Sequence, residues 1–332
     1  MITRGPRRAF SALRQLSVIG APYSLGQPLV GPDDAPNKLR EHGLLRHAAD
    51  AGWRVHDHRN IECVFHDSSR DSSSALANNS ELVGQYCQTI RQQLKPIAES
   101  DDFILILGGD HSIPMGTLPA IRAARPNTGV VWVDAHSDIN TTATSPSGNL
   151  HGMTVAVLMG LEPKLLTTPQ FQWLAQSFAE DFSTGTGDST AACLAPEDLI
   201  YVGLREVDPG EKAAIQSLGI KAYTMSDIDR LGIGRVMDEV CGYFASRDMD
   251  IHCSFDIDAI DPFWAPHTGT GVIGGLTFRE GNYICEALHS TGRFTSLELV
   301  EVNPQLHADV GPEKTIEMSL TVICSALGRT IL

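Results

Sequence analysis

Several features are scarce or missing in this sequence of 332 residues, and each absence excludes a class of protein. No stretch approaches the about 18 consecutive apolar residues that a membrane-spanning helix requires, so we expect no membrane span. Basic residues are fewer than acidic ones: the chain has 25 Lys and Arg and 40 Asp and Glu, which gives a formal net charge of −15. This balance argues against nucleic acid as a partner, since binding a phosphate backbone depends on dense positive charge.

The cysteines and the N-terminus bear on the compartment. None of the seven cysteines forms a CxxC pair, which predicts a reducing compartment and favours the cytoplasm. Acidic residues are missing from positions 1–31, which contain Arg4, Arg7, Arg8 and Arg14. Such a composition is found in organelle transit peptides and also in plain basic termini. We therefore interpret 1–14 as a basic N-terminal extension and keep a mitochondrial location as the alternative to a cytoplasmic one.

Apolar runs bounded by turn residues alternate with helical periodicity, which predicts an α/β fold. The runs lie at about 16–22, 103–109, 130–135, 199–204, 251–258 and 297–302, and helical stretches lie at 81–98, 210–218 and 234–246. This alternation predicts a mainly parallel sheet covered by helices on both faces. Segments 66–80 and 179–196 are predicted as surface loops, and no internal repeat is present. We expect one catalytic domain over 15–332.

Four of the predicted strands end in carboxylates or imidazoles. In open α/β sheets, ligands bind outside the carboxyl ends of the strands, so these positions are candidates for a site. The sequences are Asp110-His111-Ser112 after the 103–109 run, Asp134-Ala-His136-Ser-Asp138 after 130–133, Asp256-Ile-Asp258 after 251–255, and Glu301-Val-Asn303 after 297–300. Polar residues at four strand exits predict one shared site.

The spacing of these residues points to metal ions. If the backbone stays extended, residues i, i+2 and i+4 face the same side, which would aim Asp134, His136 and Asp138 at one point and would do the same for Asp256 and Asp258. Carboxylates so crowded repel one another unless a cation neutralises them. Two His with four Asp is a hard, oxygen-rich donor set that suits Mn²⁺ better than Zn²⁺. Two such ions lower the pKa of a shared water, so hydrolysis is the expected reaction.

With these residues in view, the motifs resemble those of a known family. GGDHS at 108–112, DAHSDIN at 134–140, SGNLHG at 147–152, SFDIDAIDP at 254–262 and EVNP at 301–304 are similar, in order, to the signatures of the ureohydrolases, most closely the arginases. The resemblance runs from IGAPYSLGQ at 19–27 to the EVNP strand. It implies a three-layer α/β/α fold of the arginase/deacetylase type.

The resemblance also implies the ligand set. Each subunit would hold two Mn²⁺, one completed by His111 and Asp138 and the other by His136 and Asp258, with Asp134 and Asp256 bridging both. A hydroxide between the ions would attack L-arginine to give L-ornithine and urea. Asp138 would also orient the hydroxide, Glu301 would hold the guanidinium, and His151 would carry a proton to the leaving amine.

The substrate's amino-acid end is expected to meet residues beyond the metal motifs. By resemblance to arginases, Asn140, Ser145 and Ser147 would contact the α-carboxylate, Asp208 and Glu211 would lie on the ammonium side, and Thr270 would lie near the metal cluster. Agmatinases resemble this chain at the metal motifs but lack the SGNLHG loop, so arginine is favoured over agmatine. An agmatinase-like hydrolase and a catalytically silent scaffold protein of the same fold are the alternatives.

Some positions depart from the arginase pattern. Glu206 replaces a common Asp and is expected to lengthen a carboxylate near the amino-acid end of the pocket. His267 and Gly271 stand where small residues and a proline are usual, and 162–198 is longer than in short arginases. Arg279, Glu280 and Glu286 match interface positions of trimeric members, which implies a homotrimer or a hexamer built from trimers.

Overall fold

The computed structural model describes residues 14–62, 76–182, 192–306 and 311–329. The predicted basic extension 1–14 therefore lies outside the described residues, except for Arg14, which begins the first strand. No helix in these ranges is long and apolar enough to cross a membrane.

The described chain forms one parallel sheet of eight strands in the order β2-β1-β3-β8-β7-β4-β5-β6. The strands are β1 (Arg14–Ala21), β2 (Trp53–Asn60), β3 (Phe103–Gly108), β4 (Thr128–Val133), β5 (Leu199–Leu204), β6 (Lys221–Thr224), β7 (Asp250–Asp256) and β8 (Phe294–Val300). The predicted mainly parallel sheet is thereby confirmed. β8, the last strand in the chain, lies between β3 and β7 near the middle of the sheet.

Strands β2 and β6 did not stand out in the sequence because they form the two edges of the sheet. Exposed and half-buried residues interrupt β2, and β6 has no fully buried residue. The six predicted strands, by contrast, consist almost wholly of buried residues. An edge strand needs no continuous apolar run, so composition alone does not reveal it.

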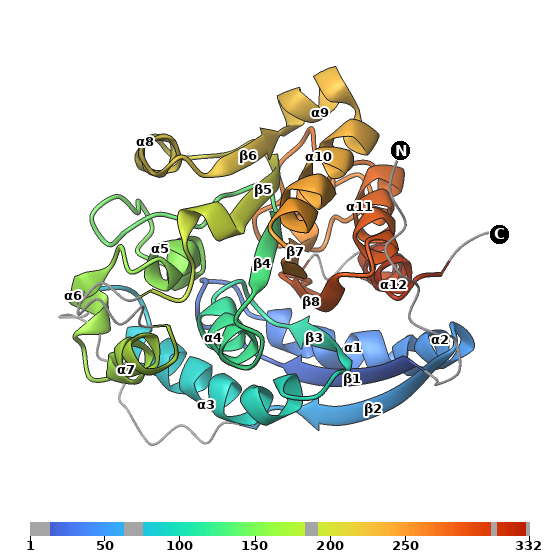
Figure 1. Cartoon of the computed structure of the whole chain (residues 1–332). Coiled ribbons are helices and arrows are strands. Elements are labelled where there is room, and N and C mark those ends of the chain that lie inside the picture. The colour runs from blue at the N-terminus through green and yellow to red at the C-terminus, as the bar shows by residue number, and fades with distance from the viewer. Residues whose placement is uncertain (1–13, 63–75, 183–191, 307–310, 330–332) are drawn as a thin grey trace.

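Helices cover both faces of the sheet, which gives the expected three layers (Figure 1). One face is covered by α1 (Ala35–Glu41), α2 (Leu44–Asp50), α9 (Met225–Leu231), α10 (Ile233–Ser246), α11 (Phe278–Ser290) and α12 (Glu313–Ala326). The other is covered by α3 (Ser80–Ala98), α4 (Pro114–Ala124), α5 (Thr154–Leu158), α6 (Pro163–Leu166), α7 (Gln172–Asp181) and α8 (Pro209–Leu218). Short 3-10 helices are η1 (Pro32–Asp34), η2 (Leu150–Met153), η3 (Pro196–Asp198) and η4 (Ile257–Ala259).

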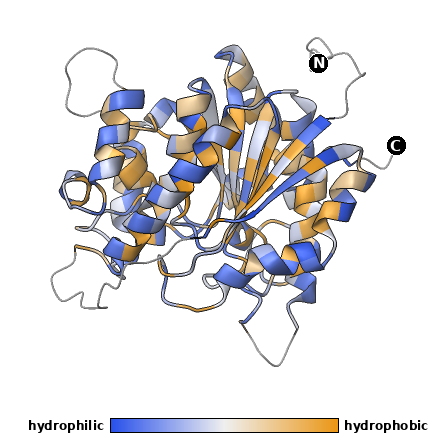
Figure 2. Ribbon diagram, turned by 90° about the horizontal axis from the view of Figure 1, so that it is seen from below, coloured by the Kyte–Doolittle hydropathy of each residue, from blue (hydrophilic) through white to orange (hydrophobic). Residues whose placement is uncertain are grey.

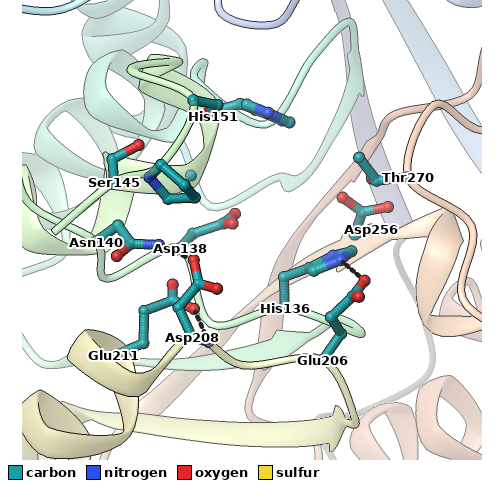
Figure 3. A pocket seen from close by; sticks show the side chains of 13 residues that line it. His136, Asp138, Asn140, Ser145, His151, Glu206, Asp208, Glu211, Asp256 and Thr270 are labelled. Carbon is teal, nitrogen blue, oxygen red and sulfur yellow. Dashed lines mark hydrogen bonds and ion pairs between the residues drawn. The ribbon is translucent and has the colours of Figure 1, made fainter.

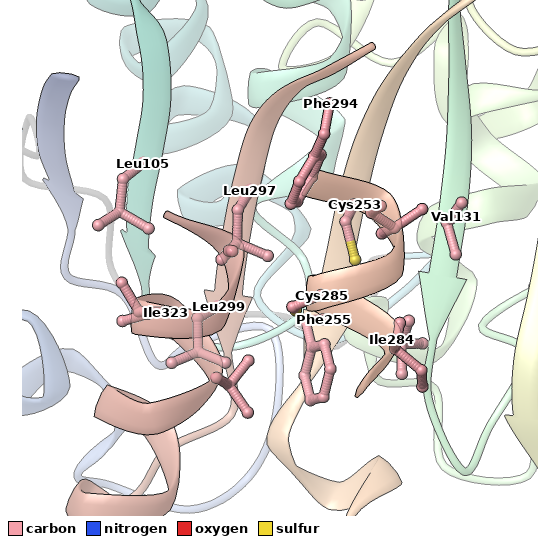
Figure 4. Packing of buried hydrophobic residues seen from close by; sticks show 14 of the residues in the cluster. Leu105, Val131, Cys253, Phe255, Ile284, Cys285, Phe294, Leu297, Leu299 and Ile323 are labelled. Carbon is pink, nitrogen blue, oxygen red and sulfur yellow. The ribbon is translucent and has the colours of Figure 1, made fainter. Parts of the chain in front are cut away.

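The two faces of the sheet pack into two separate hydrophobic cores, although the second face of β7 carries the buried polar residues His252, Ser254 and Asp256. On β7, Cys253 and Phe255 pack with α11 and α12, and on β3, Ile104 and Ile106 pack with α3 and α4. Figure 2 shows the apolar strands between helices whose outer surfaces are hydrophilic, and Figure 4 shows the first core between β3, β8, β7, β4 and the two helices. Burial on both faces explains the unbroken apolar runs of the sequence.

The two predicted loops are shorter than expected. Helix α3 already begins at Ser80, and α7 continues to Asp181, so helix occupies the end of the first segment and the start of the second. The 162–198 segment holds α6, α7 and η3. The middle parts, 63–75 and 183–191, lie outside the described residues.

Candidate metal centre and substrate pocket

The four strand exits predicted from the sequence lie side by side. Strands β3, β8, β7 and β4 are consecutive neighbours in the sheet, and they end at Gly108, Val300, Asp256 and Val133. Because all four run parallel, their carboxyl ends meet at the same edge. The loops that follow them bring the predicted metal-binding residues together.

The backbone does not stay extended through these exits, so the alternation argument for the direction of the side chains is wrong. Strand β4 ends before Asp134, Asp138 has a left-handed backbone with φ 50°, and Asp258 lies in the 3-10 turn η4. The aim comes instead from tight turns closed by Asp side chains. Asp134 Oδ1 accepts the His136 N–H at 2.7 Å, and Asp256 Oδ1 accepts the Asp258 N–H at 2.7 Å. Such side-chain turns compete well with strand structure.

These turns make the predicted ligands converge on buried points. His111 Nδ1 lies 3.0 Å from Asp134 Oδ2, 3.1 Å from Asp138 Oδ2 and 3.1 Å from Asp256 Oδ2. His136 Nδ1 lies 3.0 Å from Asp258 Oδ2 and 3.4 Å from Asp134 Oδ1. Among the described residues, two groups can each hold a metal ion: His111, Asp134 and Asp256, and Asp134, His136 and Asp258. Asp134 belongs to both.

The unmet polar atoms of this cluster fit a cation. Within the described part of the chain, neither His111 Nδ1 nor Asp138 Oδ2 has a hydrogen-bond partner, although both atoms are buried and lie 3.1 Å apart. Donor atoms about 2.1 Å from an ion and at right angles around it are separated by about 3 Å. The donor set of carboxylate oxygens and imidazole nitrogens therefore suits divalent ions bound here.

Without a cation, three of the four carboxylates, those of Asp138, Asp256 and Asp258, have raised pKa values and resist ionisation. Burial raises the pKa of Asp138 to about 7, and repulsion from Asp134 adds to the rise. Burial also raises the pKa of Asp256 and of Asp258, again with repulsion from neighbouring carboxylates. A bound cation offsets both causes, because it favours the charged form of each group that it contacts.

Two supporting residues escaped the sequence interpretation. The ring of Trp132 stacks on that of His111 at 4.2 Å, and its Nε1–H donates to Asp134 Oδ2 at 3.0 Å. Ser254 Oγ lies 2.8 Å from His111 Nε2, on the side of the ring away from the carboxylates. Each stands two residues before a predicted Asp ligand. A residue that could donate a hydrogen bond, two positions before a predicted ligand and on the same face of the strand, is the signal that could have identified them.

Glu301 and His151 form a pair beside the cluster. Glu301 has a left-handed backbone, with φ 60°, and its Oε1 accepts the His111 N–H at 2.8 Å and lies 3.2 Å from His151 Nδ1. Burial lowers the pKa of His151, but the Glu301 carboxylate outweighs burial and raises that pKa to about 9. The pair thus favours a protonated imidazole next to the cluster.

A pocket of about 230 Å³ opens above the cluster (Figure 3). Ten of the predicted site residues line it: His136, Asp138, Asn140, Ser145, Ser147, His151, Asp208, Glu211, Asp256 and Thr270. Pro146, Gly152 and Glu206 complete the lining. His111, Asp134, Asp258 and Glu301 do not line the pocket and are almost completely buried.

The end of the pocket away from the cluster is polar and internally bonded. Asn140 Nδ2 donates to Asp208 Oδ2 at 2.9 Å, and Ser145 Oγ accepts the Gly148 N–H at 3.0 Å. Glu211 accepts the N–H groups of Ile139 and Asp208 at 3.2 and 2.9 Å, the latter as part of the capping box that starts α8. Glu211 is therefore occupied by backbone, whereas Asp208 faces the pocket.

The departures noted in the sequence lie at different places. Glu206 Oε2 is 3.2 Å from His136 Nε2, so Glu206 stands at the metal end of the pocket, not at the amino-acid end as expected. The expectation failed because residues 206 and 208 diverge as the chain turns into α8. Thr270 donates to Asp258 Oδ2 at 2.8 Å, while His267 is fully buried and does not line the pocket.

Comparison with known proteins gives consistent matches over almost the whole chain. The model of the Arginase family matches residues 14–328. Arginase-1 of Homo sapiens is 38% identical over 321 residues, which is 95% of this chain and 94% of that protein. Arginase of Neurospora crassa is 41% identical over 331 residues, covering 96% and 87%. The solved structure of arginase from Bacillus caldovelox superposes with a TM-score of 0.84 at 34% identity, covering 96% of this chain and all of that one.

Proposed function

This chain belongs to the arginase family, and from that premise we propose how its residues hydrolyse L-arginine to L-ornithine and urea. The enzyme is a hydrolase that acts on the guanidino C–N bond of arginine. One structural observation carries the proposal, namely that His111, His136 and four Asp converge, and that three of them, His136, Asp138 and Asp256, line a pocket whose other walls carry polar side chains.

We assign the metal ions as two Mn²⁺ per subunit. His111, Asp134, Asp138 and Asp256 would hold one ion, and Asp134, His136, Asp256 and Asp258 the other, which agrees with the shared position of Asp134. When bound, the pair supplies a water of lowered pKa, and so a nucleophile near neutral pH. Mn²⁺ is favoured because carboxylate oxygens outnumber nitrogens in this set.

Three residues beside the metal ions, Asp138, Glu301 and His151, would orient the nucleophile, hold the guanidinium and donate a proton. The Asp138 carboxylate faces both the ligands and the pocket, so it can accept a hydrogen bond from the nucleophile and direct it toward the guanidinium carbon. Glu301 lies 3.2 Å from His151, which lines the pocket, and its negative charge would attract the guanidinium. His151, protonated beside Glu301, can donate its proton to the leaving amine, and its partial exposure leaves a path for a proton from water.

The polar far end of the pocket would select the amino acid. Asn140, Ser145 and Ser147 present an amide and two hydroxyls that suit an α-carboxylate, and Thr270 lies across the pocket near the metal end. Asp208 would meet the α-ammonium directly. Glu211 would act through Asp208, because both its oxygens bind backbone N–H groups. Agmatine has no carboxylate to occupy these donors, which supports arginine as the substrate.

The test compares urea release from arginine and from agmatine by the purified enzyme and two variants, with bound manganese measured in each. Asp138→Ala is expected to lose metal and activity together. Asp208→Ala is expected to keep its metal and to raise the KM for arginine about tenfold or more, since it removes a charged hydrogen-bond partner. Full activity of the Asp138 variant, or preference of the wild-type enzyme for agmatine, contradicts the proposal.

We also propose a homotrimer or a hexamer of trimers. The support is an exposed aromatic surface made of Phe263, Trp264 and Phe278, in which Phe263 is 67% and Phe278 40% exposed. Beside it, Arg279 and Glu286 form an exposed ion pair at 2.6 Å that can exchange partners between subunits. Large exposed aromatic groups commonly mark interfaces. Sedimentation of the Phe263→Ser/Phe278→Ser double variant should give monomers, whereas Leu76→Ser, at another exposed site, should not change the mass.

For the compartment we propose the cytoplasm. The six cysteines within the described ranges are free thiols, as a reducing compartment requires. The arginine-rich N-terminus keeps a mitochondrial location as the alternative, and imaging of the tagged full chain with and without residues 1–13 distinguishes the two.

A further inference from the structure

Asp110 is a fully buried carboxylate that neither binds metal in the proposed set nor lines the pocket. We propose that Asp110 is a positioning residue that places His151 opposite Glu301 and so controls the proton transfer to the leaving amine. The inference rests on the role proposed for His151 above.

The Asp110 carboxylate joins two loops that are distant in sequence. Its Oδ2 accepts the N–H of Gly26 at 2.7 Å, and its Oδ1 accepts both the N–H of Ser112 and the Ser112 hydroxyl. The Asp110 N–H donates to Tyr23 O at 2.9 Å. Asp110 thus connects the loop after β1 to the loop after β3, which carries His111. Both its side chain and its backbone take part in this connection.

Gly26 passes this connection to His151. The Gly26 carbonyl accepts the N–H of His151 at 3.1 Å, while its N–H is held by Asp110. A Cβ at position 26 would lie 2.5 Å from Ser112 Oγ and 2.6 Å from Asp110 Oδ1, so the carboxylate fits directly against the glycine. A shift of the carboxylate therefore moves Gly26, and with it the start of η2, where His151 stands.

The opposite side of the pair is fixed from the same loop. Glu301 N–H donates to Gly109 O at 2.8 Å, and Glu301 Oε1 accepts the His111 N–H at 2.8 Å. Gly109 and His111 are the neighbours of Asp110 in the chain, so the two backbone groups that bind Glu301 lie on either side of Asp110. The Asp110 side chain also binds Gly26, in the loop that contacts His151. The 3.2 Å distance between His151 Nδ1 and Glu301 Oε1 consequently depends on the position of Asp110.

The decisive experiment is a double-mutant cycle on the manganese-loaded enzyme. Asp110→Asn keeps an oxygen for Ser112 but turns an NH₂ group toward the Gly26 N–H, so two donors face each other. We expect this variant to keep its bound manganese and its KM for arginine while kcat falls about tenfold, because a small misplacement of a catalytic group is expensive. His151→Asn alone should lower kcat about 100-fold. In the His151→Asn background, Asp110→Asn should not lower kcat any further.

Two comparisons keep the result unambiguous. Ser112→Ala removes only the hydroxyl donor to Asp110, so it should disturb folding less than Asp110→Asn does. We expect it to lower kcat about threefold, again only when His151 is present. Asp198→Asn changes another buried carboxylate, which pairs with Arg122 at the amino end of β5. Its effect on kcat should be the same with His151 present and in the His151→Asn background.

Each failure has a distinct meaning. If His151→Asn keeps full activity, the proposed role of His151 is wrong and the inference falls with it. If His151→Asn is impaired but Asp110→Asn and Ser112→Ala lower kcat equally in both backgrounds, the proposed function stands and the inference is wrong. Loss of manganese from Asp110→Asn also overturns it, because the residue would then act through His111.

Discussion

Asp138 and Glu301 share an uncommon backbone conformation. Both have positive φ, 50° and 60°, which costs a residue with a Cβ roughly 1–2 kcal/mol. Backbone hydrogen bonds hold them there: Asp138 O accepts the N–H of Val155 at 2.8 Å, and Glu301 N–H donates to Gly109 O at 2.8 Å. The main chain therefore fixes the direction in which each side chain leaves the backbone before any ligand binds.

Ser254 is expected to tune the affinity for metal. Its hydroxyl lies 2.8 Å from His111 Nε2 and fixes which ring nitrogen faces the carboxylates, so Ser254→Ala should weaken manganese binding about 10- to 100-fold in calorimetric titrations. Ser296→Ala is a matched control, because Ser296 is equally buried and lies 2.9 Å from His252, which is not a proposed ligand. Both variants should lose about 1 kcal/mol of stability. Equal manganese affinity of the two variants would contradict the role of Ser254.

His151 should make the stability of the metal-free protein depend on alkaline pH. Its pKa is raised from 6.5 to about 9, mainly because the Glu301 carboxylate outweighs the effect of burial. The stabilisation by this pair is therefore complete below pH 6.5 and is lost as the pH rises through about 9. The difference in free energy of unfolding between wild type and His151→Asn should shrink between pH 7 and pH 10. A constant difference over that range in denaturant titrations would show that the pair does not titrate as described.

At the scale of elements, the start of α8 links stability to substrate binding. Glu211 closes the capping box with Asp208 and also binds the N–H of Ile139, next to Asp138. Glu211→Ala should lower the free energy of unfolding by about 1–2 kcal/mol and raise the KM for arginine. Glu280→Ala removes the equivalent residue of the capping box of α11, on the surface, and should cost about 1 kcal/mol or less without changing KM. If both variants keep the wild-type KM, the helix start does not shape the pocket.

The same elements show how far the sequence could be used for prediction. Six strands with continuous apolar runs were predicted correctly, and the polar residues at their exits lie together, because runs buried on both faces mark the centre of a parallel sheet. Strands β2 and β6 could not be predicted, since edge strands carry mixed polarity. Glu206 was misplaced because a turn separates side chains two residues apart, and turns are decided by hydrogen bonds that spacing does not reveal.

At the scale of the whole molecule, bound metal should contribute substantially to stability. Manganese at about 100 times its dissociation constant adds about 2.7 kcal/mol for each independent site. For a chain of this size, two such sites together raise the melting temperature by roughly 8 °C. Calorimetry of the chelator-treated protein, before and after manganese is added, measures the shift. In Asp256→Asn the shift should be clearly smaller, because a proposed ligand to both ions is weakened. An unchanged melting temperature on adding manganese would contradict metal binding by the folded chain.

The central position of β8 has a consequence for how the protein is made. This strand, at residues 294–300, pairs with β3 on one side and β7 on the other, so the two halves of the sheet are joined only after residues 294–300 have been synthesised. Until then one edge of β3 and one edge of β7 lack a partner strand, and we expect their backbone N–H and C=O groups to be open to pairing with other chains. Folding must await the C-terminal part, the contacts it forms span long sequence distances, and the nascent chain should depend on chaperones to protect those edges.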